Sequence, residues 1–119
     1  MSELPICTTL AECLEHDGER VQALGVYTLY DPFPGRKQGP ERTLLVYLQT
    51  GEAEHGPFLE PFWHPDAIRT AEERQQYAEE QVKVVGVFYA QQPRQPGEPA
   101  EAVSFGGPCI HPVESIDAA

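Results

Sequence analysis

Basic side chains are scarce in this sequence. Its 119 residues include 8 lysines and arginines against 19 aspartates and glutamates, which gives a formal net charge of −11 at pH 7. Nucleic-acid binding depends on Lys and Arg side chains that neutralise phosphates, and anionic membranes attract the same side chains. The composition therefore disfavours nucleic acids and membrane surfaces as partners. It is compatible with high solubility or with a cationic protein partner.

Long apolar runs are missing as well. No stretch of about 18 apolar residues occurs, so the sequence predicts no transmembrane helix. Residues 1–6 have neither a basic region nor an apolar core, so we expect no signal peptide. Only Cys7, Cys13 and Cys109 are cysteines, and an odd number without a secretion signal favours reduced thiols in a cytoplasmic protein.

Signatures of catalysis and of metal binding are also lacking. The sequence has no G-x-S-x-G elbow and no C-x-x-C pair. Cys109 and His111 lie two residues apart, so on a strand they point the same way without facing each other. We therefore predict no enzyme activity, no cofactor and no metal. A metal-binding or thiol-dependent protein that uses Cys109 and His111 is an alternative.

Proline and glycine, in contrast, are abundant. The chain has 12 prolines and 10 glycines, and many of them cluster in residues 31–40 and 92–108. Such clusters indicate irregular loops, and long loops of this kind are usually functional or disordered. The length predicts a single domain over residues 1–119.

Two segments of the sequence resemble each other. Residues 19–27 and 80–88 are both rich in β-forming residues, and each contains one glycine, Gly25 or Gly86, followed by valine and an aromatic residue. A glycine inside a strand usually marks a bulge, a bend or a close backbone approach. We expect these segments to be neighbouring strands that curve together, with the two glycines side by side.

The remaining elements follow from alternation and capping patterns. Thr9 and Glu12 match the capping box and predict a short helix over about residues 9–17, and Thr70 and Glu73 match it again inside a second helix. Residues 51–56 read as a polar turn. Alternating or β-rich runs predict five strands, over residues 21–30, 43–50, 58–64, 81–91 and 109–116, with the second helix over 66–80.

This order of elements resembles the oligonucleotide/oligosaccharide-binding (OB) fold. The resemblance covers about residues 19–117 and is carried by Gly25, the 66–80 helix and the run Val82–Phe88. It implies a mainly β protein, a small five-stranded OB-like Greek-key barrel. A short N-terminal helix precedes the barrel, and one helix lies between strands three and four. In that fold the first strand pairs with the second and the fourth. An unrelated small α+β sandwich is the alternative.

The resemblance also implies where a ligand binds. OB folds use the face of strands two and three together with the loops after strands one and four. Trp63 is either a core residue or an exposed anchor for a partner. The candidate ligand-binding residues on this basis are Arg36, Lys37, Arg42, Tyr47, Trp63 and Arg94.

Charge and loop length together predict a function. We expect a non-enzymatic OB-like binding or adaptor module that contacts a protein partner through its acidic surface and its Pro/Gly-rich loops. Binding of single-stranded nucleic acid or a nucleotide on the barrel face is an alternative, because basic loops and aromatic side chains accompany such binding. A homodimer formed through an exposed strand edge also stays open.

Overall fold

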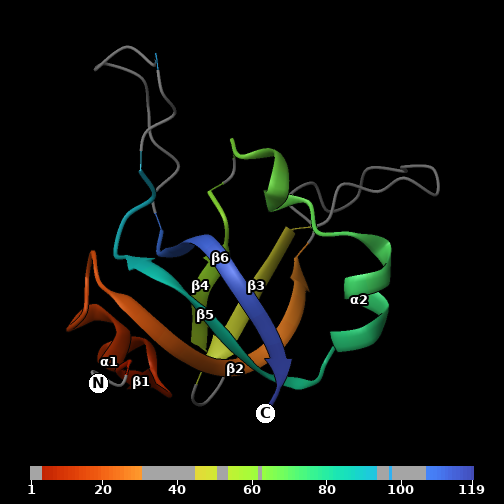
Figure 1. Cartoon of the computed structure of the whole chain (residues 1–119), viewed down its shortest axis with the longest axis horizontal. Coiled ribbons are helices and arrows are strands. Elements are labelled where there is room, and N and C mark those ends of the chain that lie inside the picture. Colours follow the sequence, from red (N-terminus) through yellow and green to blue (C-terminus); the bar gives the residue numbers. More distant parts are fainter. Residues whose placement is uncertain (1–3, 31–44, 51–53, 62, 94–96, 98–106) are drawn as a thin grey trace.

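The protein is mainly β. The computed structural model describes residues 4–30, 45–50, 54–61, 63–93, 97 and 107–119. Within them lie six strands and two short α-helices (Figure 1), which confirms the predicted mainly β class. In chain order they are β1 (Ile6–Cys7), α1 (Leu10–Leu14), β2 (Arg20–Tyr30), β3 (Leu45–Thr50), β4 (Glu54–Leu59), the 3-10 helix η1 (Pro65–Ala67), α2 (Ala71–Tyr77), β5 (Gln81–Tyr89) and β6 (Cys109–Ala118).

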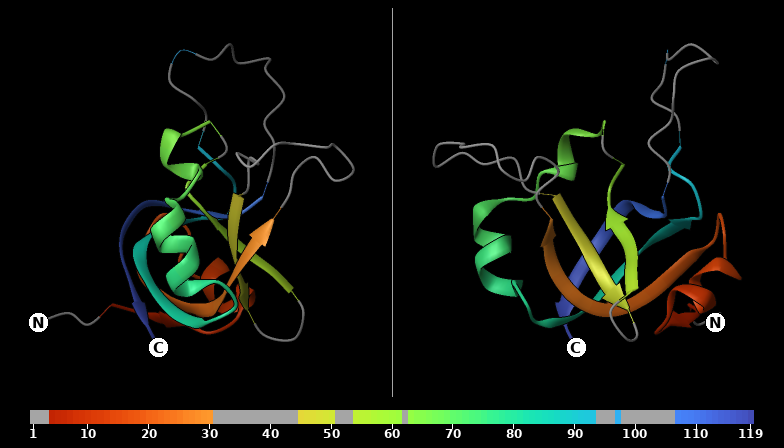
Figure 2. Two further views of the ribbon diagram at one scale, coloured as in Figure 1. Left: turned by 90° about the vertical axis from the view of Figure 1, so that its right-hand side faces the viewer. Right: turned by 180° about the vertical axis from the view of Figure 1, so that it is seen from behind.

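The pairings of β2 to β6 form a closed ring of strands. β2 pairs antiparallel with β3, β3 with β4, and β5 with both β6 and β2, while β4 and β6 pair in parallel. β1 adds a short parallel pairing to β2. The front and rear views show β2 as a long curved strand, with α1 and β1 at one end of the sheet and α2 at the other (Figures 1 and 2).

The two similar segments are neighbours, as the repeat predicts. β2 and β5 pair over seven residues, but the glycines do not face each other: Gly25 is opposite Val82, and Gly86 is opposite Val21. Each glycine instead lets another strand pack closely against it, β3 at Gly25 and β6 at Gly86. A Cβ atom at Gly25 would lie 2.9 Å from the carbonyl oxygen of Gln49 on β3. The glycines are therefore places of close backbone approach.

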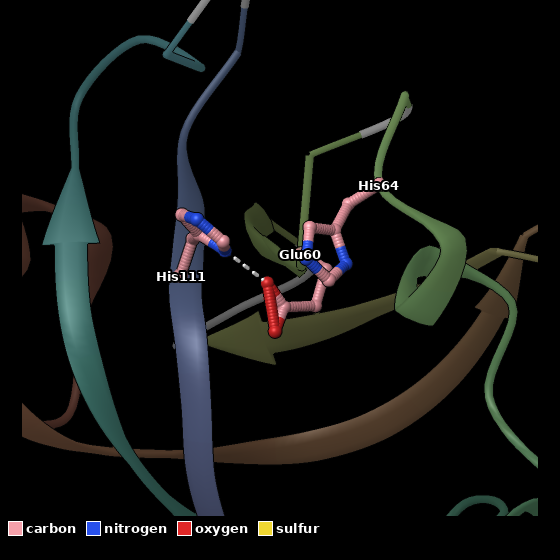
Figure 3. Close-up of side chains that lie close together, drawn as sticks. All are labelled: Glu60, His64 and His111. Carbon is pink, nitrogen blue, oxygen red and sulfur yellow. Dashed lines mark hydrogen bonds and ion pairs between the residues drawn. The ribbon is translucent and has the colours of Figure 1, made fainter. Parts of the chain in front are cut away.

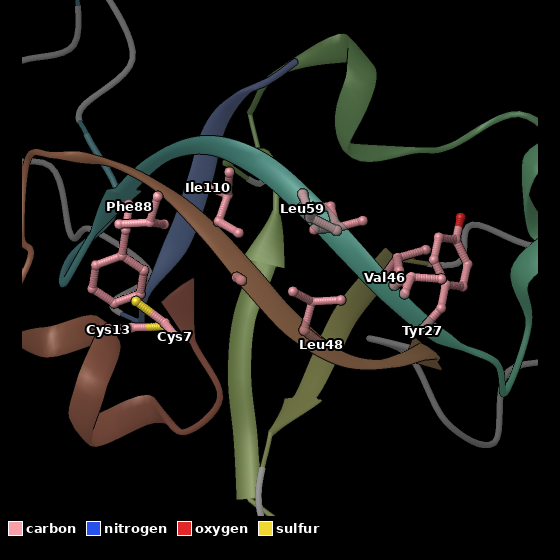
Figure 4. Packing of buried hydrophobic residues seen from close by; sticks show 12 residues of the cluster. Cys7, Cys13, Tyr27, Val46, Leu48, Leu59, Phe88 and Ile110 are labelled. Atoms are coloured by element: carbon pink, nitrogen blue, oxygen red, sulfur yellow. The ribbon is translucent and has the colours of Figure 1, made fainter. Parts of the chain in front are cut away.

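The core lies between the inward faces of these strands. In β2 and β5 buried residues alternate with half-buried ones, the period expected of strands with one covered face. Cys7 of β1 and Cys13 of α1 are fully buried beside Phe88, so the N-terminal elements share the same core (Figure 4). The buried cluster comprises Cys7, Cys13, Val21, Ala23, Tyr27, Val46, Leu48, Leu59, Val82, Val84, Phe88 and Ile110.

The first helix begins as predicted and ends earlier. The Thr9 hydroxyl accepts the amide hydrogen of Glu12 at 3.1 Å, so Thr9 is the N-cap. Glu12 reaches back and accepts the backbone N–H of Thr8 at 3.0 Å. The helix stops at Leu14, because the chain then turns through residues 15–18 and reaches Gly18 at φ +81°.

The second predicted helix is two shorter elements. The Thr70 hydroxyl accepts the amide hydrogen of Glu73 at 3.1 Å, and Thr70 itself is extended with ψ 154°. A residue in that conformation cannot continue a helix, so the capping box inside residues 66–80 marks the start of α2 and separates it from η1. Glu79, at φ 62°, follows the end of α2.

The third strand is also placed differently from the prediction. Thr50 pairs directly with Glu54, so β4 starts inside the predicted turn at 51–56 and ends at Leu59, before the predicted end at 64. Gly56 allows this, since a Cβ atom there would lie 2.2 Å from the Leu48 carbonyl oxygen. The chain therefore leaves the sheet after Leu59, and the segment that follows contains Trp63 and His64.

Candidate functional site

The chain leaves β4 at an unusual residue. Glu60 has φ 77°, in the left-handed region that residues other than glycine seldom adopt. Its side chain is only 3% exposed. Its backbone N–H donates to the Ile110 carbonyl at 2.9 Å, which extends the β4–β6 pairing. A buried carboxylate on strained backbone needs compensating contacts, and such residues cluster at functional sites.

Two groups on β6 supply those contacts. The Val113 amide donates to Glu60 Oε2 at 3.0 Å, and His111 Nδ1 contacts Oε1 (Figure 3). One hydrogen is shared between the imidazole nitrogen and the carboxyl oxygen in this contact. Val87 of β5 faces two residues of β6 here, His111 and Pro112, because Gly86 pairs with Val113 and Phe88 with Ile110. Such a bulge re-aims a side chain.

A second histidine approaches from the other side. His64 precedes η1, and its Nδ1 accepts the amide hydrogen of Asp66 at 3.0 Å. The His64 and His111 rings lie 4.9 Å apart, centre to centre. One ligand atom from each of Glu60, His64 and His111 falls within 4.8 Å of the other two. We call these three side chains the acid–histidine cluster.

Trp63 forms one wall of this cluster. Its indole ring lies 5.7 Å from the His64 ring and 6.1 Å from the His111 ring. The indole N–H donates to the Pro93 carbonyl at 2.8 Å, so the segment after β5 is held here as well. Trp63 was predicted either as core or as a partner anchor. It is half-buried and lies beside the polar side chains of the cluster.

The cluster adjoins a polar groove between α2 and β6. Two hollows, of about 390 and 210 Å³, share Arg69, Thr70, Glu73 and Val113 in their walls. We call them together the α2–β6 groove. The smaller hollow reaches Glu60, so the groove begins at the acid–histidine cluster.

Carboxylates dominate the charge of the groove. One guanidinium, that of Arg69, lines it, and Glu73 holds that guanidinium through two bonds of 2.8 Å, from Nε and Nη2. Glu114 is bonded to Arg20 at 2.7 Å in a pair that is largely exposed and therefore weak. The acidic side chains of the lining are Glu60, Asp66, Glu72, Glu73 and Glu114.

A partly buried hydrogen-bond network connects the groove to the core. The Tyr27 hydroxyl donates to Glu73 Oε2 at 2.7 Å, so Glu73 links α2 to β2. Burial, and then the neighbouring carboxylate, raise the pKa of Tyr27, which keeps its hydroxyl protonated as a donor. The bidentate Arg69–Glu73 pair has side-chain exposures of only 15% and 18%. The groove wall is thus a rigid arrangement.

Two of the six predicted ligand residues lie within the described residues. Trp63 is at the acid–histidine cluster. Tyr47 is on β3, opposite Phe58 of β4, and both rings are half-buried and pack edge-on with Tyr30. The four predicted cations fall outside the described residues: Arg36, Lys37, Arg42 and Arg94.

Cys109 is unsuited to thiolate chemistry. It is fully buried, and burial together with the nearby Glu60 charge raises the pKa of its thiol to about 12. A thiolate is the reactive form, so the alternative prediction of a Cys109–His111 reactive pair gains no support from this environment. Within the described residues, the group of metal-binding side chains that contains His111 includes Glu60 and His64 and leaves out Cys109.

Alkylation tests the low reactivity of the Cys109 thiol directly. We expect iodoacetamide to modify Cys109 at pH 8 at least 100-fold more slowly in the native protein than in urea, because little thiolate forms and the sulfur is covered. Mass spectrometry of the peptide that contains Cys109 measures the rate. Equal rates in the two states would show that the sulfur is accessible and ionised.

Sequence reasoning missed Glu60 and His64 as site residues. It treated both as parts of a strand interrupted by Pro61. The available signal was that proline itself: it breaks a strand, so the polar residues on either side of it could leave the sheet and meet another element.

Comparisons of this chain with protein-family models, with curated proteins and with solved structures found no match. No helix in the described part of the chain has the length and apolar character of a membrane span. The function must therefore be inferred from the geometry of the groove and of the cluster.

Proposed function

We propose that this protein is a non-enzymatic OB-like binding module whose α2–β6 groove accepts a basic segment of a protein partner. The OB-like assignment is supported by the pairing order. β2, the first strand of the closed circuit, pairs with the second and the fourth, β3 and β5, and α2 lies between the third and fourth strands, β4 and β5.

The charge of the groove is the observation that carries the proposal. Five carboxylates line it against one guanidinium. Glu73 holds that guanidinium, and Glu114 has only a weak, exposed partner in Arg20, so the groove keeps an excess of negative charge. Lysine and arginine side chains form charge-assisted hydrogen bonds to carboxylates, whereas phosphates are repelled by them. Ligand pockets for small molecules are mostly apolar, and this groove is polar, so an extended polar peptide is the better fit. The overall charge of −11 would steer such a partner toward the protein.

A titration with labelled peptides tests the proposal. We expect a ten-residue peptide rich in Lys, Arg and Gly to bind saturably by fluorescence anisotropy at low salt, and an acidic peptide of the same length not to bind. The Glu72→Lys/Glu114→Lys double variant should weaken binding at least tenfold, because it places like charges against the peptide.

Glu15→Lys is the matched control. Glu15 is exposed at the end of α1, away from the groove, so one reversal there changes the net charge without changing the groove. Equal weakening by one reversal at Glu15 and one at Glu72 would assign the effect to overall charge and reject the groove. An absence of saturation up to about 1 mM, the limit of weak binding, would reject the basic partner.

The aromatic side chains on the β3–β4 face favour a second candidate, single-stranded nucleic acid or a nucleotide. Tyr47 and Phe58 lie 5.8 Å apart, centre to centre, and Tyr30 is within 6.3 Å of Tyr47. Their strand neighbours Leu48 and Leu59 point into the core, so the rings occupy the opposite face of the sheet. Bases stack on such rings in OB folds. A labelled ten-nucleotide single strand in the same titration distinguishes this ligand from the peptide.

A further inference from the structure

We propose that the acid–histidine cluster binds a divalent transition-metal ion, with Zn²⁺ as the preferred occupant. Two imidazoles and one carboxylate are a donor set that zinc accepts when a water completes the coordination, and imidazole nitrogen suits first-row transition metals better than Mg²⁺ or Ca²⁺. Glu60, His64 and His111 come from three different places in the fold, the end of β4, the segment before η1 and β6 (Figure 3).

Binding requires the three donors to rearrange around the ion. The three ligand atoms lie within 4.8 Å of one another, and donors about 2.0–2.1 Å from a tetrahedral Zn²⁺ are separated by about 3.3 Å. His64 and His111 have side-chain exposures of 22% and 27%, so both rings are partly open to solvent. The ion would replace the hydrogen between His111 Nδ1 and Glu60 Oε1, while Oε2 keeps the Val113 amide.

The backbone holds all three donors in place. Glu60 is fixed by its pairing to Ile110 and sits at positive φ, where strain is usually retained for a function. The β6 bulge places His111 against it. The His64 backbone N–H donates to the Pro61 carbonyl at 2.9 Å, which orients the third donor. If the Glu60–His111 contact served only to stabilise the fold, His64 would not need to be held beside it.

Asp66 would complete the second layer of the site. Its carboxylate Oδ2 lies 3.9 Å from His64 Nδ1, which now accepts the Asp66 amide hydrogen. When His64 Nε2 binds a metal, the ring proton moves to Nδ1, so the hydrogen bond from the Asp66 amide breaks. The Asp66 carboxylate would then have to move from 3.9 Å into hydrogen-bond distance to accept the Nδ1 hydrogen. Metal-binding histidines almost always donate their other N–H to such an acceptor, whose loss typically weakens affinity 10–100-fold.

Calorimetry on the untagged full chain tests this inference. We expect Zn²⁺ to bind with a stoichiometry of one per chain and to raise the unfolding midpoint, because a ligand that binds only the folded state stabilises it. Co²⁺ should give the intense visible absorption of a tetrahedral site. A lack of saturable Zn²⁺ binding by the folded chain would overturn the proposal.

Variants separate the cluster from other side chains. His64→Ala should abolish the one-to-one binding and leave the circular dichroism spectrum unchanged, because His64 lies outside the strands. Asp66→Ala should weaken Zn²⁺ binding about tenfold. The matched control is His16→Ala, since His16 also contacts a carboxylate, that of Glu19 at 2.8 Å, but without a third donor. Binding that persists in His64→Ala, or that is lost in His16→Ala, contradicts the assignment.

The proposed metal site and the groove share Glu60 and Asp66, but the tests of the two proposals are independent. Zn²⁺ alone is the probe in its test, and no peptide is required. Failure of the metal titration would leave the groove proposal intact, and failure of the peptide titration would leave the metal site intact.

Discussion

Replacing Gly86 with alanine should lower the free energy of unfolding by about 3 kcal/mol, the upper end of the usual cost of overpacking. The new Cβ atom would lie 2.4 Å from Ile110 Cγ2 and 2.4 Å from the Pro112 carbonyl oxygen. Ile110 is fully buried and cannot rotate away, and the Pro112 oxygen belongs to the β6 backbone. β5 and β6 must therefore move apart next to the bulge that positions His111.

The entropy that alanine saves relative to glycine is too small to offset the cost of this steric clash. Alanine normally gains about 0.5–1 kcal/mol over glycine because it loses less backbone entropy on folding. Thermal unfolding measures the result, and a loss of about 3 kcal/mol corresponds to a decrease of about 10 °C in the midpoint for a domain of this size.

Gly25→Ala is the graded control for this prediction. Its Cβ atom would meet the Gln49 backbone oxygen at 2.9 Å and Leu48 Cβ at 3.1 Å, so β2 and β3 must also shift, but by less than β5 and β6, and we expect a cost of about 1 kcal/mol. If Gly86→Ala were as stable as the wild type, β5 and β6 could not approach as closely as described, and the positioning of His111 by the bulge would have to be abandoned.

Glu73→Ala should destabilise the protein by about 2 kcal/mol, because the Arg69–Glu73 pair is only partly buried and its loss falls between the costs for an exposed and a buried ion pair. The substitution removes the acceptor of both Arg69 bonds and of the Tyr27 hydroxyl. It leaves a guanidinium and a phenol partly buried with no acceptor in that position, which costs more than the lost attraction itself. Urea denaturation at pH 7 measures the difference.

The effect of Glu73 also depends on pH. Burial raises the pKa of the Glu73 carboxyl, but the hydrogen bonds from Arg69 and Tyr27 outweigh it, so the folded-state pKa is lower than the ordinary value of 4.5. The stabilisation by Glu73 is therefore complete above that ordinary value and is lost as the pH falls through the folded-state pKa. The stability difference between the wild type and Glu73→Gln should shrink below about pH 4, near the usual Glu range.

Glu72→Ala is the neighbouring control. Glu72 is exposed in the first turn of α2, so its removal should change stability by less than about 0.5 kcal/mol. Equal effects of the Glu72 and Glu73 substitutions would mean that the Arg69–Glu73–Tyr27 network contributes no more than a surface charge.

Local patterns were sufficient for much of the fold. Alternation placed β2 and β5 almost to the residue, and the single glycine in each predicted that these strands are neighbours. The Thr9 hydroxyl caps a helix at the predicted start, and the capping box at Thr70 was recognised, although it begins α2 instead of lying inside a longer helix. These features depend on backbone geometry and on contacts three or four residues apart, which a sequence displays directly.

Element ends were predicted less well, because neighbouring strands decide them. β4 begins at Glu54 since Thr50 pairs with it, and it ends before Glu60, which adopts a positive φ. Nothing in the propensities of Glu54 or Glu60 signals either event. The pairing partner determines which of several marginal residues joins the sheet.

The sequence by itself determined the mainly β class, the order of the two α-helices and of β2 to β6, and an acidic chain poor in basic residues, because composition and periodicity are local properties. Only the tertiary structure decided that Glu60 and His111, 51 residues apart, meet each other and His64 at the end of β4. That meeting depends on the parallel β4–β6 pairing and on the β6 bulge. Both depend on β6 pairing with β4 on one side and β5 on the other, which brings together residues that no local sequence pattern connects.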